Sequence, residues 1–369
     1  MSETASESSD GATDVPIDEA ARELLVDLVE IPSIAPDEGD CAERLAAFFE
    51  ANDREVWIDE VGNVRAPADD GVLLTSHIDT VPGDIPVRVE EGSGETGDDA
   101  AGADVLWGRG SVDAKGPLAA LAVAAVRTGA SFVGVVGEEV DSRGSRYLVD
   151  DREAAPDAVV NGEPSGANGI TLGYRGLLGG TYVATSESGH SSRPENNAIQ
   201  DAMDWWHRVE SEFGHDEWVP VFERVTCKPT EFSGGPSADG LSVEATMEVQ
   251  LRVPPEYATG EVRELADGHL ANGTVNWHDT VEPVMQNPRT PVARAFRAAI
   301  RKRGVDPRLL RKTGTSDMNV YAQAWNCPMV TYGPGDSDLD HAPDEHLPLP
   351  EYDRAVAVLE DAAATLLDD

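Results

Sequence analysis

The chain has 369 residues, which is enough for one large domain or two of ordinary size. Its formal net charge of −41 comes from 69 acidic against 28 basic residues, and this sign argues against nucleic acid as a partner. The cations include few lysines (Lys115, Lys228, Lys302 and Lys312). Acid excess with scarce lysine resembles proteins from the salt-filled cytoplasm of halophiles, where salt screens self-repulsion.

The chain carries no sign of export or of membrane insertion. Cys41, Cys227 and Cys327 lie far apart and form no CxxC pair, which predicts reduced thiols. Residues 1–16 have no basic region and no apolar core, so we expect a short disordered acidic tail. No apolar run approaches the roughly 18 residues that span a membrane. These features predict a soluble, cytoplasmic protein.

The first part of the chain alternates helices with short buried strands. Helices are predicted by apolar spacing or alanine content over 17–30, 42–51 and 116–129, the last ending at Gly129. Apolar runs bounded by turn residues predict parallel strands at 72–74, 132–136 and 158–160. The acidic, glycine-rich stretch 90–104 is interpreted as a solvated loop. This alternation predicts an α/β layer sandwich, with chemistry at the carboxyl ends of its strands.

After Gly173 the order changes to βαββαβ, which fits a small ferredoxin-like domain. Its strands are predicted at 178–187, 219–233, 241–253 and 273–285, and its helices at 196–212 and 258–270. A helix over 291–303 and a strand over 329–332 then resume the first pattern. We therefore expect a discontinuous catalytic domain (17–173 and 286–369) with an inserted α+β domain (174–285).

Five motifs with metal-ligating residues follow one another, each in a small-residue turn. They contain His77, Asp113, Glu138-Glu139, Glu163 and His341. Two imidazoles plus several carboxylates without a nearby thiol suit a pair of zinc-like ions. Two ions that share a carboxylate can generate hydroxide at neutral pH and polarise a carbonyl. A single motif could be ordinary acidic surface or a core histidine, but the five in this order predict a dinuclear site.

Two neighbouring positions refine this interpretation. Asp79 lies two residues after His77, so on a strand both face the same side and Asp79 can hold the imidazole in the required tautomer. The adjacent acids Glu138 and Glu139 would repel one another without a nearby dication. One of them can bind metal while the other takes a proton from water.

The motifs TSHIDTVPG, WGRGSVDAKG, VGVVGEEVD, VVNGEPS and SDLDHAPDEH resemble a known family. It is that of the dinuclear zinc amidohydrolases, which include acetylornithine deacetylase, succinyl-diaminopimelate desuccinylase and glutamate carboxypeptidase. The resemblance covers about residues 20–365 and implies a three-layer zinc-hydrolase domain with an inserted lid. It implies two zinc ions, with cobalt as an alternative, held by His77 and Glu163, by Glu139 and His341, and by the bridging Asp113. It also implies that Glu138 is the general base and that Asp79 supports His77.

The same resemblance assigns substrate contacts to the inserted domain. His190 matches a lid histidine that reaches across a dimer to the oxyanion, which implies a homodimer. Arg175 and Arg252 match positions that grip a substrate carboxylate, although either can instead be a structural ion pair. Thr315 falls in a motif that lines the pocket. Asp239 stands where relatives often have Asn, and its charge disfavours an anionic acyl group such as succinyl.

The motifs SHIDTVPGDIPVR, KTGTSDMNVYA and TYGPGDSDLDHAPDEH look most like one branch of the family. That branch releases lysine or ornithine from the terminal glutamate of an acidic amino-group carrier protein. The alternatives are an acetylornithine or acetyl-lysine deacetylase, a carboxypeptidase or dipeptidase, and a non-catalytic metal-binding protein. Residues 289–312 hold nine cations against one acid, and we predict that this basic patch docks the carrier. The alternative is a solvated helix face with local ion pairs.

Overall fold

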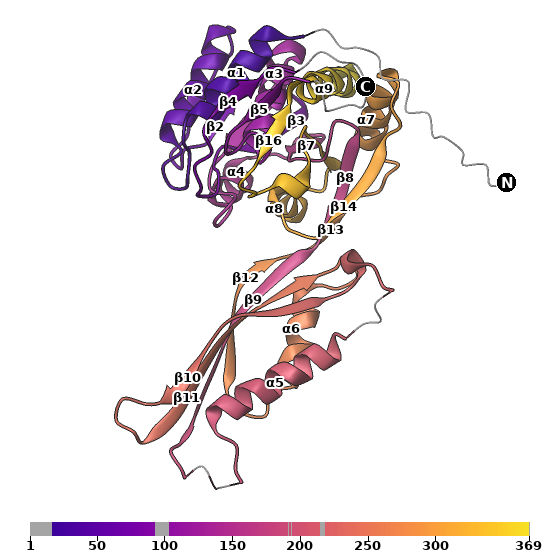
Figure 1. The fold of residues 1–369 in the computed structure, drawn as a ribbon. Helices are drawn as coiled ribbons and strands as arrows, with labels where there is room; N and C mark the ends of the chain where they lie inside the picture. The colour runs from indigo at the N-terminus through magenta and orange to yellow at the C-terminus, as the bar shows by residue number, and fades with distance from the viewer. Residues whose placement is uncertain (1–16, 93–102, 191, 193, 215–217, 369) are drawn as a thin grey trace, which may run out of the picture. The chain divides into compact units, whose positions relative to one another are not determined.

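The computed structural model describes residues 17–92, 103–190, 192, 194–214 and 218–368 (Figure 1). The predicted acidic tail and most of the acidic loop (93–102) lie outside these residues. The chain forms two compact units. Unit 1 comprises residues 1–172, 286–310 and 324–369, and unit 2 comprises residues 173–285 and 311–323. Unit 2 therefore takes in a segment after residue 310 as well as the predicted insertion.

Unit 1 is built on a mixed sheet whose centre is parallel. Its strand order is β1 (Trp57–Ile58), β2 (Val64–Ala66), β6 (Ala130–Val135), β3 (Asp69–His77), β7 (Val159–Gly162), β15 (Met329–Thr331) and β8 (Gly169–Tyr174). Strands β6, β3, β7 and β15 run parallel, whereas β1, β2 and β8 join antiparallel. The parallel strands are almost wholly buried, as their continuous apolar runs require. The predicted α/β class and its three early strands are confirmed.

Helices pack with these strands around one core (Figure 1). They are α1 (Glu19–Glu30), α2 (Gly39–Ala51), α3 (Lys115–Thr128), α7 (Pro291–Lys302) and α9 (Leu349–Asp368). The alanines of α3 are buried along almost its whole length, since small side chains let a helix lie close to its neighbours. As predicted, α3 ends at Gly129, whose left-handed φ of 80° suits glycine at a helix terminus. The C-terminal helix α9 was not among the predicted elements.

The remaining helices and strands are shorter. Helix α4 (Arg143–Asp151) follows β6, and a separate sheet contains β16 (His346–Pro348), β5 (Val105–Trp107) and β4 (Arg88–Glu90) in that order. Two further strands pair with β8, namely β13 (Val284–Met285) and β14 (Arg308–Lys312), and helix α8 (Asp317–Ala324) follows β14. In the described parts of the chain no helix is both long and apolar enough to cross a membrane.

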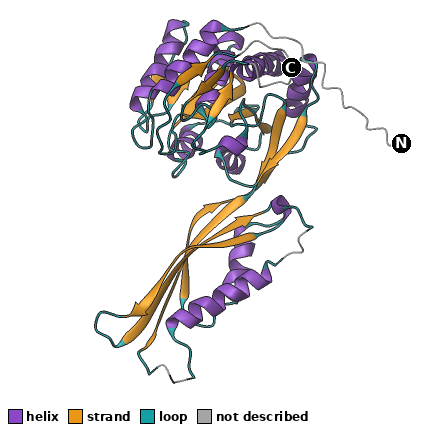
Figure 2. Ribbon diagram, viewed as in Figure 1, coloured by secondary structure: helices purple, strands orange, loops and turns teal. Residues whose placement is uncertain are grey.

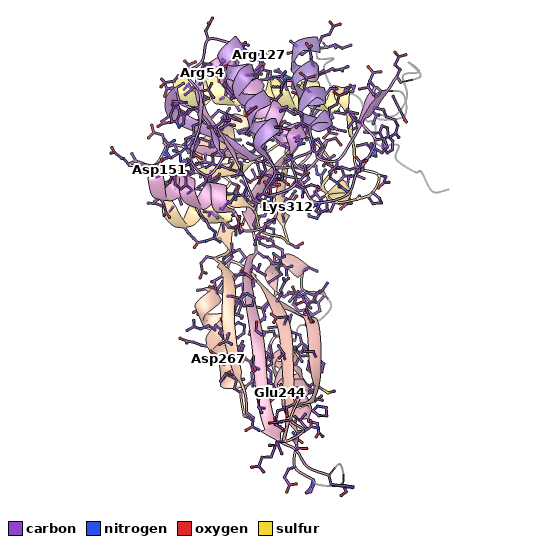
Figure 3. All side chains as sticks on the ribbon, turned by 90° about the vertical axis from the view of Figure 1, so that its left-hand side faces the viewer. Arg54, Arg127, Asp151, Glu244, Asp267 and Lys312 are labelled. Atoms are coloured by element: carbon purple, nitrogen blue, oxygen red, sulfur yellow. The ribbon has the colours of Figure 1, made fainter. Side chains whose placement is uncertain are left out.

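Unit 2 has the predicted βαββαβ order. Its elements are β9 (Gly176–Glu187), α5 (Ala198–Glu212), β10 (Thr226–Pro236), β11 (Ser242–Val253), α6 (Thr259–Gly268) and β12 (Thr274–Val281). The sheet order β10-β11-β9-β12, with every neighbour antiparallel, is the ferredoxin-like arrangement. Alternate residues of β9 and β11 are buried under α5 and α6, while residues such as Glu244 point to solvent (Figures 2 and 3).

Two predicted strand boundaries in this unit were wrong, and proline explains both. Residues 219–225, expected to begin a strand, contain the 3₁₀ turn η1 (Val221–Glu223) after Pro220. The expected strand 273–285 is divided into β12 and β13, because Pro283 has no N–H with which to continue the ladder.

Candidate metal centre

The four parallel strands of unit 1 end at one edge of the sheet, and each leads to a predicted metal ligand. His77 is the last residue of β3, Glu163 follows β7 directly, and Glu138 and Glu139 follow β6 after a short turn. His341 follows β15 after the 3₁₀ turn η2 (Ser337–Leu339). Because the carboxyl ends of parallel strands meet, ligands distant in the chain become neighbours.

Asp113, from the loop between β5 and α3, lies between the two imidazoles. Its Oδ1 is 3.2 Å from His77 Nε2, and its Oδ2 is 3.3 Å from His341 Nε2. Glu163 Oε1 lies 3.9 Å from His77 Nε2, and Glu139 lies 3.1 Å from His341 Nε2. The structure thus brings all five predicted ligands together, with one oxygen of Asp113 facing each histidine.

The chemistry of this cluster fits divalent cations. Ligand atoms of His77, Asp113 and Glu139 all lie within 4.8 Å of one another. Burial and the charge of Asp113 raise the pKa of Glu139 to about 7. A hydrogen bond to Asp113 and the charge of Glu139 raise the pKa of His341 to about 9, against a smaller opposing effect of burial. A bound dication would stabilise carboxylates this close together in their charged form, and the nitrogen and oxygen donors suit zinc-like ions.

Asp79 is fully buried and uses three oxygens to hold other parts of the centre. Its Oδ1 accepts a hydrogen bond from Glu138 N at 3.1 Å, and its Oδ2 accepts one from Glu139 N at 3.0 Å. Its carbonyl oxygen lies 2.9 Å from His77 Nδ1, and its Oδ1 lies 3.6 Å from the same nitrogen. A proton on Nδ1 would leave the Nε2 lone pair facing Asp113 and Glu163.

Gly137 shapes the turn that presents the two glutamates. Its φ of +74° lies in the left-handed region, and an added Cβ would stand 2.2 Å from Arg143 Nη1. The left-handed φ therefore favours glycine where the chain leaves β6. Glu138, half-buried, comes next and is followed by the candidate ligand Glu139.

A role for Glu345 was not predicted from the sequence. Its fully buried carboxylate accepts hydrogen bonds from Gly110 N, Val112 N and Asp113 N at 2.8–3.1 Å. It also pairs with Arg109 Nη1 at 2.7 Å. Glu345 therefore holds the loop that presents Asp113. Its position in the HAPDEH motif, four residues after His341, was the available signal, but acids are too common in this chain for that to reveal burial.

The predicted substrate residues all lie in unit 2. The guanidinium of Arg175 is buried and donates to Thr313 O at 2.9 Å, to Thr226 Oγ1 at 2.8 Å and to Val221 O at 3.2 Å. These bonds hold the chain leading to Thr315. Burial and the charge of Arg252 lower the pKa of Arg175 to about 10, which leaves it charged at neutral pH.

Arg252 and Thr315 are brought together within unit 2. Arg252 Nη1 lies 3.5 Å from Thr315 Oγ1, a weak contact that leaves most of the guanidinium's donors available. His190 is exposed, and its Nδ1 lies 2.8 Å from Ser192 Oγ. The substrate-binding roles of these residues stay predictions.

Asp239 lies at the exposed turn between β10 and β11. Its Oδ1 accepts hydrogen bonds from Ser237 Oγ at 2.7 Å and from Leu241 N at 3.0 Å. These bonds lower the pKa of its carboxyl and organise the turn. Its predicted effect on acyl-group choice stays a prediction.

Comparison with known proteins agrees with this geometry. The sequence model of peptidase family M20/M25/M40 matches residues 73–365. A LysW-lysine hydrolase of Deinococcus radiodurans is 39% identical, and the match covers 96% of this chain and 99% of that protein. A protein of Thermococcus kodakarensis is 36% identical over 93% of this chain and 91% of its own, and is provisionally named a LysW-lysine/LysW-ornithine hydrolase.

A solved structure shares the fold. The M20 family metallo-carboxypeptidase of Sulfolobus solfataricus superposes with a TM-score of 0.74 at 19% identity, over 96% of this chain and all of that one. The match to the family model and the identity to these two relatives establish the family of the chain. This protein belongs to peptidase family M20/M25/M40 and is a hydrolase, which confirms the family that its motifs predicted.

Proposed function

We propose that the protein is a cytoplasmic two-zinc amide hydrolase that releases lysine, ornithine or both from the terminal glutamate of an acidic amino-group carrier protein. The observation that carries this proposal is the 39% identity, over nearly the whole of both chains, to the LysW-lysine hydrolase. Unit 1 would be the catalytic domain, and the ferredoxin-like unit would be its lid. Cobalt is the alternative ion.

The arrangement of unit 1 supports hydrolysis of an amide. When bound, the two ions would polarise the amide carbonyl and lower the pKa of a water molecule. We assign His77 and Glu163 to one ion, Glu139 and His341 to the other, and Asp113 to both. Glu138 takes a proton from the attacking water and passes it to the leaving α-amine, while Asp79 holds its backbone in place.

Arg252 is the better candidate for gripping the α-carboxylate of the released amino acid. Among the described residues its guanidinium makes one weak hydrogen bond, to Thr315, so its planar fork can bind a carboxylate in a bidentate way. Arg175 already donates to four acceptors within unit 2. We assign it to positioning the segment that carries Thr315.

The lid would form a homodimer in which His190 of one subunit completes the site of the other. This is testable by mixing two inactive variants, Glu138→Gln and His190→Ala. In a random mixture, heterodimers would carry one complete site each and restore about a quarter of wild-type activity. Absence of any recovery, with mixed dimers demonstrated by mass, would remove the role across the dimer.

The basic face of α7 supports docking of an acidic carrier. Arg294 and Arg301 are exposed and Arg297 is half-buried, and none of the three forms an ion pair within the described chain. Neighbouring cations do pair locally: Lys302 and Arg303 with Asp361, and Arg311 with Glu223. We therefore restrict the proposed docking surface to Arg294, Arg297 and Arg301.

Amine release by the purified, zinc-loaded protein in molar KCl tests the proposed function. Carrier-linked lysine and carrier-linked ornithine would be compared with Nα-acetylornithine and with an ordinary peptide. Preference for a carrier conjugate is expected and would name the amino acid. Preference for acetylornithine would make the protein a deacetylase, and release of a C-terminal residue from the peptide would make it a carboxypeptidase.

A further inference from the structure

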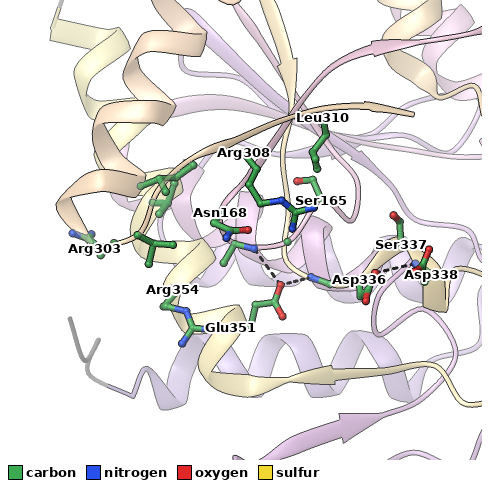
Figure 4. A pocket seen from close by; sticks show the side chains of 16 residues that line it. Ser165, Asn168, Arg303, Arg308, Leu310, Asp336, Ser337, Asp338, Glu351 and Arg354 are labelled. Atoms are coloured by element: carbon green, nitrogen blue, oxygen red, sulfur yellow. Dashed lines mark hydrogen bonds between the residues drawn. The ribbon is translucent and has the colours of Figure 1, made fainter. Parts of the chain in front are cut away.

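Unit 1 contains a cavity of about 520 Å³, a volume typical of small-molecule sites (Figure 4). Its walls come from the loop after β7, the end of α7, strand β14, the turn before His341, and α9. None of the predicted ligands, nor Asp79 or Glu138, lines it. The cavity is therefore a feature separate from the groups that carry the proposed chemistry.

Three arginines line this cavity: Arg303, Arg308 and Arg354. Among the described residues, neither Arg308 nor Arg354 has a side-chain hydrogen bond or ion pair. Unpaired guanidiniums are unexpected in a chain where acids outnumber bases 69 to 28. In Figure 4 the guanidinium of Arg308 points into the cavity, toward Ser165. Such planar cations suit a carboxylate ligand.

Carboxylates face the same cavity. Asp336 and Asp338 are exposed at its edge, and within the described residues Asp336 Oδ1 accepts one hydrogen bond, from the backbone N–H of Asp338 at 3.0 Å. The Asp338 side chain has no hydrogen bond or ion pair within the part of the chain that the structure describes. Available charges of both signs on one small cavity match a zwitterion better than a simple anion, which the two aspartates would repel.

The cavity walls are held in place before any ligand binds. Glu351 Oε1 accepts hydrogen bonds from Ala167 N and Gly335 N, each at 3.1 Å, and so joins two loops (Figure 4). Ser165 N donates to Gly333 O at 3.1 Å, which joins the same loops again. One loop follows Glu163 and the other precedes His341. A ligand in the cavity would contact both loops that carry predicted metal ligands.

We propose that this cavity is a second binding site, outside the metal centre, for a free α-amino acid. The ligand carboxylate pairs with Arg308, whose guanidinium points into the cavity (Figure 4), and its α-ammonium group pairs with Asp336 and Asp338. The ligand class follows from the cavity itself. Only the choice of lysine and ornithine as first probes rests on the proposed function, since both are products of that reaction.

Calorimetric titration of the full-length, zinc-loaded protein with L-lysine and L-ornithine tests this site. Wild-type protein is expected to show one more saturable site per chain than Arg308→Gln/Arg354→Gln. The matched control Arg146→Gln/Arg263→Gln removes two exposed arginines elsewhere and should behave like wild type. Equal stoichiometry and affinity in the cavity variant and wild type would overturn the proposal.

Binding of lysine analogues that lack one charged group provides a second test of the site. Removal of the α-ammonium group, as in 6-aminohexanoate, should weaken binding at the extra site at least tenfold. Asp336→Asn/Asp338→Asn changes only exposed side chains and should weaken lysine binding to a similar extent. Equally tight binding of phosphate or hexanoate would overturn the amino-acid assignment. Because stoichiometry is measured without turnover, failure of the proposed reaction would appear only in the amine-release assay.

Discussion

Asp79 shows how much of the centre depends on single residues. Its two carboxylate oxygens hold the amides of Glu138 and Glu139, and its carbonyl oxygen lies against the ring of His77. One buried residue therefore links the proposed base to two proposed ligands, one for each ion.

The variants Glu138→Gln and Glu139→Gln should fail in different ways. Glu138→Gln is expected to retain both metals and lose roughly 10²- to 10⁴-fold in kcat, because only proton transfer is removed. Glu139→Gln should lose metal together with activity. Metal content, measured by mass spectrometry, and kcat are compared between the two variants and wild type on the same samples. Metal loss from Glu138→Gln would mean that the two roles are wrongly assigned.

Glu345→Gln should weaken the metal centre without touching a metal ligand. An amide cannot satisfy all four donors of Gly110, Val112, Asp113 and Arg109, and breaking a buried charge pair costs about 3–5 kcal/mol in the free energy of unfolding. Zinc affinity should fall roughly 10- to 100-fold, as for other residues that orient ligands.

The control for Glu345 is Glu360→Gln. Glu360 pairs with Arg127 in a partly exposed position, so its loss should cost less than about 1 kcal/mol. Denaturant unfolding and zinc titration of both variants measure the difference. Similar small effects in both would show that Glu345 does not hold the Asp113 loop.

Zinc binding should release protons. The pKa of His341 is raised to about 9 in the metal-free centre, so its imidazole is protonated at pH 7 and must lose that proton to bind a cation. Apparent zinc affinity should therefore rise with pH between 7 and 9. Titration in weakly buffered solution is expected to detect about one proton fewer per chain for His341→Asn than for wild type. Equal release would exclude His341 as a ligand.

At the scale of elements, α7 provides a test of carrier docking. Replacement of Arg294, Arg297 and Arg301 by glutamine should raise KM for carrier-linked substrate roughly threefold to a hundredfold, since each surface charge contributes about 0.2–1 kcal/mol. KM for a small acylated amino acid should stay the same. Replacement of the exposed Arg88, Arg146 and Arg263 is the charge-matched control. Equal effects on both substrates would remove the docking surface.

Elements whose apolar pattern is short and bounded by turn residues were predictable. Strands β3, β6 and β7 and the end of α3 at Gly129 follow from local sequence. Helix α9 was not predicted, although Tyr352, Val356, Leu359 and Ala363 recur on one buried face at helical spacing. Strands β4, β5 and β16 were not predicted, because a strand of three residues is too short to show an alternating pattern of apolar and polar residues.

At the scale of the whole molecule, the charge of −41 should make stability depend on salt. Raising KCl from 0.1 to 1 M shortens the Debye length from about 10 Å to about 3 Å, which weakens repulsion among the excess acids. The unfolding temperature should rise by several degrees over this range and continue upward at higher salt. Sucrose at equal osmolality is the control, and a flat or falling response to KCl would contradict the halophilic interpretation.

The sequence by itself determined the family and the five candidate ligands, because each ligand sits in a recognisable local motif. The βαββαβ order of the second unit could also be predicted from local periodicity. Only the tertiary structure decided that Asp113 lies between His77 and His341, that Glu345 holds its loop, and that Arg308 and Arg354 share a cavity with Asp336. The reason is physical: secondary-structure periodicity is local, whereas these contacts join residues tens to hundreds of positions apart or depend on burial. In a chain this acidic, composition does not reveal which carboxylates are buried.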